Sequence, residues 1–247
     1  VFALARTAAC DVFPSAAITV GRRGEALWPM AELVGLGGVI TTHAGVAEAM
    51  VEGNRVDGIA TATGDRFNVD AVVVATGANV PTALGRVGIS VPDATPNALL
   101  VRTAPVDVAL SAVLHTPRVA VRPAPGGRLV MDSGWSEREV MQLEDGSYHV
   151  PECVVPELLQ EASAVLAGAP ALEAEACGVG PKPVPGDGQP ILGRVDGITG
   201  YHVAFTHSGA TLGLIAGELV ADEVVRGEPN PLLESFRPSR FIDPKPS

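Results

Sequence analysis

One short segment limits most strongly what this chain can fold into. Residues 71–75 read AVVVA and are followed directly by Thr76 and Gly77. A strand that is apolar at every position needs other layers on both of its faces, as in a parallel sheet between helices. Val-, Ile- and Thr-rich stretches separated by turns at residues 52–54 and 64–65 precede it, which predicts a β-meander leading into this strand.

The rest of the chain predicts a mixed α/β fold with two interleaved domains. Residues 85–150 alternate in polarity and indicate an antiparallel sheet with one solvated face. We expect helices at residues 30–37 and 156–167, and irregular structure in the Gly- and Pro-rich residues 178–200. A strand at 201–205, the loop THSG and a helix at 210–226 follow. The apolar face predicted for that helix consists of Leu212, Ile215, Ala216, Leu219 and Val220.

Composition excludes several classes of protein. The net charge is −11 and basic residues do not cluster, so no nucleic-acid partner is expected. No apolar run is long and clean enough to span a membrane, and no signal peptide is visible, so we predict a cytoplasmic protein. The cysteines, at positions 10, 153 and 177, are far apart, which favours reduced thiols over disulfides.

No metal site is predicted either. The five histidines have no metal-ligand spacing: His43, His115, His149, His202 and His207. A bound metal requires several convergent ligands. We therefore interpret the histidines as structural or exposed residues, and single out His207 because it lies in the THSG loop.

The strand–THSG–helix segment at residues 201–226 has the features of a ligand site. A helix N-terminus presents unpaired N–H groups and partial positive charge, which stabilise anions. Gly209 allows close approach of a ligand to the backbone, and Gly213 allows tight helix packing. The alternative is an ordinary strand-to-helix turn with Ser208 or Thr206 as its cap.

Two further segments are candidates. Residues 182–193 (KPVPGDGQPILG) predict a rigid loop in which Lys182 could hold a substrate carboxylate; the alternative is a surface turn with a solvated lysine. Residues 75–77 follow the apolar strand, and ligands of open α/β sheets bind beyond the carboxyl ends of strands. The alternative there is a simple strand-ending turn.

With these segments in view, the sequence resembles the glycine oxidase, sarcosine oxidase and D-amino-acid dehydrogenase family of FAD-dependent flavoproteins. Residues 38–78 and 99–130 are similar to the sheet insert with its following strand and to the substrate-domain strands of that family. Residues 182–193 resemble its RP-x-P-x-DG-x-P-I-x-G loop. Residues 201–228, followed by FRPSRF, resemble its last FAD-binding strand, loop and helix.

The resemblance implies an α/β fold: the C-terminal part of a Rossmann-like FAD-binding domain interleaved with an antiparallel substrate domain. Residues 31–84 and 178–228 would belong to the FAD-binding part, residues 1–30 and 85–177 to the substrate domain, and 229–247 to a tail. The implied reaction is FAD-dependent oxidation of a small amine or amino acid. The flavin itself accepts the hydride, so no catalytic side chain is assigned.

The resemblance also implies site residues. Lys182 and His207 are the expected substrate-binding residues. Val46 would meet the adenine end of FAD, Ala75, Thr76 and Gly77 would lie near the cofactor, and the segment from His207 to Gly213 would pass the pyrimidine side of the flavin ring. That segment consists of His207, Ser208, Gly209, Ala210, Thr211, Leu212 and Gly213.

Three features depart from the family pattern. No GxGxxG segment occurs in the sequence, so we expect a C-terminal fragment that does not retain FAD alone. Lys182 stands where the family usually has Arg, unless an insertion aligns that Arg with Gly180. The helix predicted at 30–37 is also short. The alternatives are an enzyme for another amine, such as a modified nucleobase or polyamine, and a non-catalytic remnant or partner-binding subunit.

Overall fold

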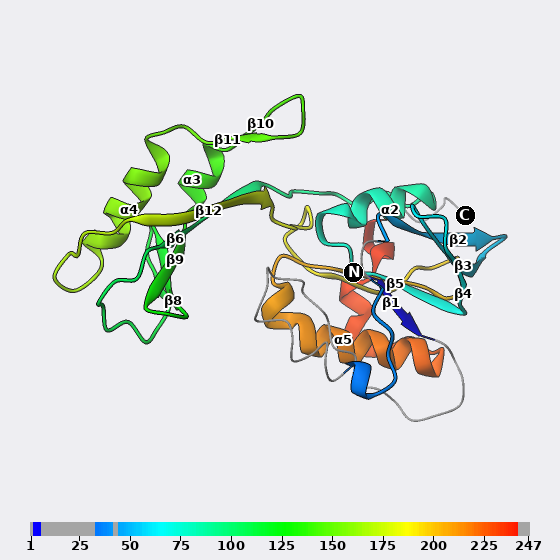
Figure 1. Cartoon of the computed structure of the whole chain (residues 1–247). Coiled ribbons are helices and arrows are strands. Elements are labelled where there is room, and N and C mark those ends of the chain that lie inside the picture. The colour runs from blue at the N-terminus through cyan, green and yellow to red at the C-terminus, as the bar shows by residue number, and fades with distance from the viewer. Residues whose placement is uncertain (1, 6–32, 42–43, 242–247) are drawn as a thin grey trace. The chain divides into compact units, whose positions relative to one another are not determined.

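The structure is a computed structural model that describes residues 2–5, 33–41 and 44–241. It divides into two compact units, shown in Figure 1 and described separately below. Unit 1 consists of Val1–Ala94 and Pro183–Ser247, and unit 2 of Thr95–Lys182. The chain therefore enters unit 2 at Thr95 and leaves it at Lys182, compared with predicted boundaries at residues 85 and 177.

A four-stranded sheet forms the centre of unit 1. Its strands are β1 (Phe2–Ala5), β5 (Ala71–Val74), β14 (Tyr201–Phe205) and β13 (Ile191–Arg194), in the order β1-β5-β14-β13. β5 and β14 are parallel, with Val74 opposite Val203, and the other two pairs are antiparallel. Two strands that are distant in sequence thus run side by side with their carboxyl ends at one edge.

Both faces of this sheet are covered, as the apolar run of β5 predicted. Val72 and Val74 pack in one core with Tyr201 and Phe205, whereas Val73 faces a separate cluster on the opposite side. Helix α5 (Gly209–Arg226) supplies Ala216 and Val220 to that second cluster. In Figure 1, α5 lies on one side of β1 and β5, and α2 lies on the other.

The first face is covered by the predicted meander and by a short helical segment. The meander consists of β2 (Ala47–Glu52), β3 (Arg55–Thr61) and β4 (Arg66–Asn68), in that order. After β5 come the 3-10 turn η1 (Gly77–Asn79) and helix α2 (Val80–Arg86). Four buried side chains of these elements pack in the same core as Val72: Val56, Ile59, Val80 and Leu84.

α5 ends where its sequence predicts. Gly227 takes the left-handed conformation (φ +70°), and its N–H bonds the Glu223 carbonyl. The predicted apolar face is wrong at Ile215, which is 49% exposed. The tail continues as η2 (Pro231–Phe236) and η3 (Pro238–Phe241), and its Leu233 is fully buried, so it forms part of the core of unit 1.

Unit 2 is an antiparallel sheet with helices on one face. The strands are β6 (Asn97–Thr103), β7 (Leu114–His115), β8 (Ala120–Ala124), β9 (Arg128–Asp132) and β12 (Ala174–Pro181), in the order β12-β6-β9-β8-β7. Between them lie α3 (Gly134–Arg138), the hairpin β10 (Met141–Gln142) and β11 (Tyr148–His149), and α4 (Val154–Ala164). Val154, Leu158 and Ala162 of α4 pack on Val101 and Met131.

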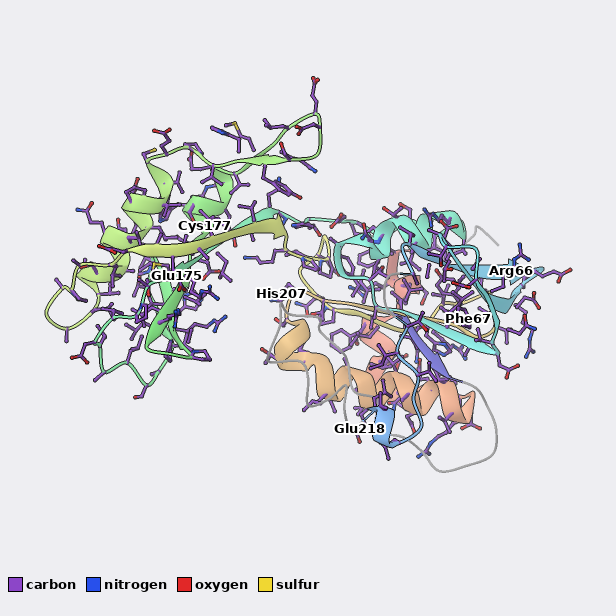
Figure 2. The ribbon with its side chains drawn as sticks, in the orientation of Figure 1. Arg66, Phe67, Glu175, Cys177, His207 and Glu218 are labelled. Atoms are coloured by element: carbon purple, nitrogen blue, oxygen red, sulfur yellow. The ribbon has the colours of Figure 1, made fainter. Side chains whose placement is uncertain are left out.

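The other face of this sheet carries charged side chains, as the alternating pattern predicted. Arg102 of β6 and Arg122 of β8 both lie directly opposite Val130 of β9. Figure 2 shows Glu175 and Cys177 on β12 at the edge of this sheet. The antiparallel sheet with one solvated face is therefore confirmed.

One sequence prediction of secondary structure is wrong, and two lie partly outside the described residues. Residues 178–200 are not all irregular, because β12 extends to Pro181 and β13 spans Ile191–Arg194. Both are edge strands, where Gly and Pro are tolerated because one side of the strand makes no ladder bonds. Of the helix predicted at 30–37, residues 33–35 are helical and 30–32 are not described. Within 1–30 only β1 is described, and it pairs with β5 of unit 1.

Candidate functional site

Two predicted ligand loops meet at the carboxyl edge of the β5–β14 pair. Residues 75–77 follow β5, and residues 206–213 follow β14. Because these strands are parallel and adjacent, the two loops leave the sheet side by side. The sequence suggested each loop separately, and the structure brings them together at the place where open α/β sheets bind ligands.

The turn after β5 carries an unused polar group. Gly77 has φ +60°, and the N–H of Asn79 donates to the Thr76 carbonyl at 3.3 Å. The Thr76 hydroxyl is buried and has no hydrogen-bond partner among the described residues. A buried hydroxyl without a partner is energetically unfavourable, and in native proteins it usually marks a missing water or ligand.

The loop after β14 leads into an uncapped helix. The N–H of Ser208 donates to the Thr206 hydroxyl at 3.2 Å, and the Ser208 carbonyl accepts the first helical bond, from Leu212 at 2.8 Å. Ser208 occupies the N-cap position, but its side chain makes no capping bond. The first N–H groups of α5 are therefore left for water or a ligand. His207 is exposed beside the start of this helix (Figure 2).

Two predicted site residues belong to neither of these loops. Val46 precedes β2 of the meander, is 61% exposed, and accepts a hydrogen bond from the N–H of Ala62 at 2.8 Å. Lys182 is the last residue of unit 2, and its Nζ lies 2.5 Å from Oε1 of Glu137 in α3. Lys182 is thus an ion-paired residue in its own unit and not a freely solvated lysine.

The Lys182–Glu137 pair has a second carboxyl group near it. Burial raises the pKa of Asp132, Lys182 opposes this shift, and Glu137 adds to it. The region therefore contains two acids for one ammonium group. Lys182 can attract an anionic ligand only in competition with these acids.

A buried charge network that sequence reasoning missed holds α5 to the tail. Glu223 and Arg237 are 2% and 8% exposed and form an ion pair in which both guanidinium Nη atoms donate to the carboxylate. The same carboxylate accepts the backbone N–H groups of Arg194 (2.9 Å) and Asn230 (2.7 Å). Burial raises the pKa of Glu223, but these donors outweigh burial and lower it overall.

Gly193 is the position that makes room for this pair. It has φ +95°, and a Cβ there would lie 2.8 Å from Oε2 of Glu223 and 3.1 Å from Nη1 of Arg237. The only sequence signal for the network was a charged residue at position 223 on the apolar side of α5. Charges on a helix are normally solvated, so this signal alone would not have identified a buried pair.

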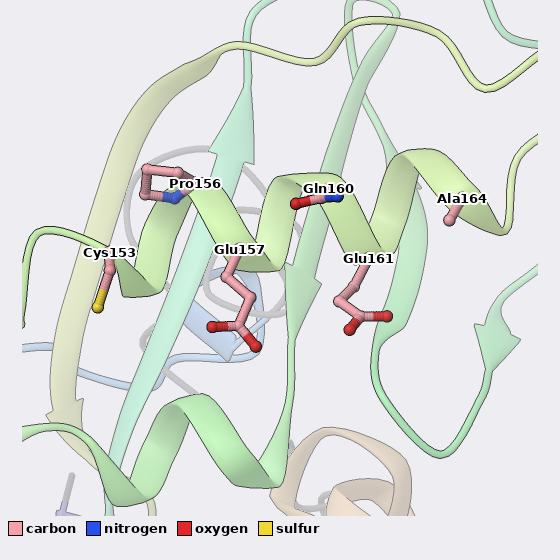
Figure 3. A pocket seen from close by; sticks show the side chains of 6 residues that line it. All are labelled: Cys153, Pro156, Glu157, Gln160, Glu161 and Ala164. Atoms are coloured by element: carbon pink, nitrogen blue, oxygen red, sulfur yellow. The ribbon is translucent and has the colours of Figure 1, made fainter.

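A surface hollow of unit 2 lies on α4 (Figure 3). Six residues line it: Cys153, Pro156, Glu157, Gln160, Glu161 and Ala164. Both carboxylates already bind Arg118, at 2.6 and 2.9 Å, and the Arg118 guanidinium stacks on Trp135 at 4.8 Å. This hollow is one side of a single helix with its charges paired, so it is not a candidate active site.

The described residues offer neither a metal site nor a membrane-spanning helix. Across residues 2–5, 33–41 and 44–241, no three His, Cys, Asp or Glu side chains converge in a way that could hold a metal ion. Within the same residues, no helix has the length and apolar character needed to cross a membrane.

His202 of β14 introduces a dependence of stability on pH. It is 7% exposed, its Nδ1 has no partner within the described part of the chain, and Glu223 and Arg194 are the charged groups near it. Burial lowers the pKa of His202, and the Glu223 carboxylate only partly offsets this. Below about pH 6.5 the unfolded chain then binds more protons than the folded one.

The contribution of His202 to the unfolding free energy of unit 1 is therefore complete above about pH 6.5 and is lost as pH falls through its folded pKa. The loss is at most about 1.4 kcal/mol per pH unit. His202→Gln should remove this part of the slope in urea unfolding between about pH 7.5 and about pH 5. The matched control His207→Gln, at an exposed site, should keep it. An unchanged slope in His202→Gln would show that other groups carry the dependence.

The comparisons with known proteins agree with this architecture. The profile of the family described as FAD dependent oxidoreductase matches residues 24–223. A search of curated proteins finds no match. Among solved structures, iminodiacetate oxidase from a Chelativorans species is 23% identical, with a TM-score of 0.70, over 86% of this chain and 57% of that one.

Two other solved structures are similar. Glycine oxidase from Geobacillus kaustophilus is 22% identical (TM-score 0.61; 79% of this chain, 52% of that one). L-Amino acid deaminase from Proteus myxofaciens is 17% identical (TM-score 0.65; 78% and 54%). The chain thus spans little more than half the length of each of these proteins. Because the family profile covers most of its residues, the chain belongs to the FAD-dependent oxidoreductase family.

Proposed function

We propose that this chain provides the flavin-ring side of an FAD site in an enzyme that oxidises an amine or amino acid. The observation that carries the proposal is the pairing of two loops at the carboxyl edge of β5 and β14. One loop offers the buried Thr76 hydroxyl, which has no partner among the residues that the structure describes, and the other offers the uncapped N-terminus of α5. The similar structures are named for iminodiacetate, glycine and L-amino acids, which supports an amino-acid-like substrate.

These groups fit a flavin in three respects. The N-terminus of α5 favours negative charge, which a reduced flavin carries on its pyrimidine side. Gly77 has φ +60°, and as a glycine it leaves the turn without a side chain next to Thr76. The Thr76 hydroxyl can donate one hydrogen bond. When bound, FAD would supply the hydride acceptor, and the chain's own residues would bind and orient it.

The proposed cofactor set remains the one that the sequence predicted. In unit 1 it comprises Ala75, Thr76 and Gly77, the segment from His207 to Gly213, and Val46 at the adenine end. We propose His207 as a substrate-side group because it is exposed at the start of α5. We propose that Lys182 binds the substrate carboxylate, for which it must first give up its ion pair with Glu137.

We expect that these residues alone do not hold the whole cofactor. The 247 residues contain no GxGxxG segment, which in this family cradles the pyrophosphate at a helix N-terminus. The alternative is therefore a chain without catalysis, either a remnant or a subunit that pairs with a partner carrying that segment. Flavin binding distinguishes the two.

The test is a flavin titration followed by anaerobic reduction. The protein as it is encoded should acquire a flavin absorption band with FAD, and iminodiacetate, glycine or another small amino acid should bleach it without oxygen. A polypeptide limited to these 247 residues should not retain FAD through gel filtration. No flavin on the encoded protein would support the non-catalytic alternative. A bound flavin that no amine reduces would refute amine oxidation.

Thr76→Val tests the proposed flavin contact. The change keeps the shape and removes a hydroxyl without a partner in the described part of the chain, so the free energy of unfolding should stay within about 0.5 kcal/mol of wild type. FAD should bind roughly 2- to 10-fold more weakly, as expected for one lost hydrogen bond. Fluorescence titration and urea unfolding measure the two effects.

Thr103→Val is the matched control. Its buried hydroxyl accepts the N–H of Leu129 at 3.0 Å in unit 2. This variant should lose about 1 kcal/mol of stability and keep its FAD affinity. Equal FAD affinity in Thr76→Val and wild type would contradict the assignment of Thr76.

A further inference from the structure

Arg240, near the end of the described chain, binds the Gly- and Pro-rich loop at residues 183–190 of unit 1. Arg240 donates from Nε to Oδ2 of Asp187 at 2.9 Å and from Nη2 to Oδ1 at 3.1 Å. The same Nη2 donates to the carbonyl of Gln189 at 3.1 Å. A planar guanidinium that binds both carboxylate oxygens and a neighbouring carbonyl fixes the position and the orientation of the loop.

Arg240 is itself held in place. Its Nη1 donates to the Arg237 carbonyl at 3.3 Å, and its guanidinium lies 4.3 Å from the centre of the Phe241 ring. The side chain is 19% exposed, so solvent screens the ion pair only partly. Arg237 in turn forms an ion pair with Glu223 of α5, so the residue that accepts this bond from Arg240 is itself held in place.

The far side of the loop is also attached. Gly186 donates to the Pro92 carbonyl at 2.8 Å, and the Val184 carbonyl accepts the N–H of Ala94 at 2.9 Å. A Cβ on Gly186 would lie 2.4 Å from Cβ of Pro92, so the backbones approach as closely as a glycine allows. The prolines at 183, 185 and 190 fix φ at three positions of the segment, and these hydrogen bonds together with Arg240 hold it on both sides.

Pro183, the first residue of this loop, lies against the turn at residues 75–79, which we propose to border the flavin. A Cβ on Gly77 would lie 3.3 Å from Cγ of Pro183, so the proline ring lies directly beside Gly77. Gly77 follows Thr76, whose hydroxyl is buried and unpartnered. A displacement of the loop would therefore alter the contact between Pro183 and Gly77.

We propose that Arg240 is a positioning residue: through Asp187 and the rigid loop 183–190 it holds Pro183 against Gly77 and sets the shape of the turn at residues 75–79. The consequence for the cofactor rests on the proposed function, because it assumes that this turn borders the flavin. The coupling between Arg240 and the turn does not, and it can be tested without FAD.

The first test is hydrogen exchange of backbone amides in Arg240→Gln and in the wild type. Loss of the forked contact should speed exchange about 10-fold or more in peptides covering residues 183–190 and also in peptides covering 75–80. Peptides covering 119–132 in unit 2 should be unchanged. Faster exchange in 183–190 alone would overturn the proposal, because Arg240 would then anchor the loop without supporting the turn.

Further variants separate positioning from a general loss of stability. Asp187→Asn should reproduce the pattern, and Arg240→Lys should restore it only partly, because an ammonium group cannot form the fork. The matched control Arg226→Gln breaks an exposed pair with Asp222 and should leave exchange in 75–80 unchanged. If both Arg240→Gln and Asp187→Asn fail to fold, the contact stabilises the whole unit and the proposal is overturned.

The flavin provides the second readout. In the encoded protein loaded with FAD, Arg240→Gln should change the visible circular dichroism of the bound flavin and weaken FAD binding about 10-fold, whereas Arg226→Gln should not. A wild type that binds no FAD would refute the proposed function and leave the exchange result standing. If Arg240→Gln keeps the wild-type flavin spectrum and FAD affinity, and amide exchange in residues 75–80 is unchanged, the positioning role of Arg240 is overturned while the proposed function stands.

Discussion

Arg237→Met is expected to lower the free energy of unfolding of unit 1 by about 3 to 5 kcal/mol. The substitution keeps much of the side-chain volume but leaves the Glu223 carboxylate, 2% exposed, without its cation. Two backbone N–H groups, of Arg194 and Asn230, still bind that carboxylate, so the lower end of the range is the better expectation. Urea unfolding followed by fluorescence and circular dichroism measures the loss.

Arg226→Met is the matched control for this prediction. Arg226 pairs with Asp222 four residues earlier on α5, but its side chain is 71% exposed. An exposed helical pair of this kind contributes about 0.3 to 0.5 kcal/mol. Similar losses in the two variants would show that burial does not determine the strength of the Glu223–Arg237 pair.

Gly200→Ala is expected to destabilise unit 1 by about 2 to 5 kcal/mol, by two additive effects. Gly200 has φ +81°, a conformation that costs other residues about 1 to 2 kcal/mol. A Cβ there would also lie 2.3 Å from the carbonyl oxygen of Asp70. That contact is with backbone and cannot relax by a rotamer change, and overpacking of this kind costs about 1 to 3 kcal/mol. Thermal and urea unfolding measure the sum.

Gly197→Ala separates the two effects within the same turn. Gly197 has nearly the same φ, +84°, but a Cβ there meets nothing within 4 Å. We expect a loss of about 1 kcal/mol from the backbone conformation alone. Gly200 also positions β14, since its carbonyl accepts the N–H of Val72 at 2.8 Å. If Gly197→Ala and Gly200→Ala cost the same, the close approach of β14 to Asp70 does not limit the fold.

Much of unit 1 could be predicted from local sequence. The strand predicted at 201–205 is β14 with the same bounds, and the helix predicted at 210–226 is α5 from Gly209 to its end at Gly227. The continuous apolar run of β5 correctly predicted layers on both faces of its sheet. These features depend on period, turn chemistry and caps, all of which act over a few residues.

Other sequence predictions failed because residues distant in sequence decide the local structure and the burial of a side chain. Glycines and prolines at 178–181 predicted irregular structure, but an edge position let them enter β12. Ile215 was expected to face the core and is instead half exposed, whereas Glu223, which no sequence pattern singled out, is buried. Periodicity identifies the faces of a helix but not what covers each face.

The mixed α/β class, the two loops at Thr76–Gly77 and THSG, and the family that they resemble could be predicted from the amino acids alone. That these loops lie side by side became visible in the folded molecule, because parallel pairing of β5 with β14 joins residues about 130 positions apart. The folded molecule also shows that Arg237 meets Glu223 and that Arg240 meets Asp187. Local patterns carry no information about which distant charges will pair, since that choice depends on how the packed elements bring their ends together.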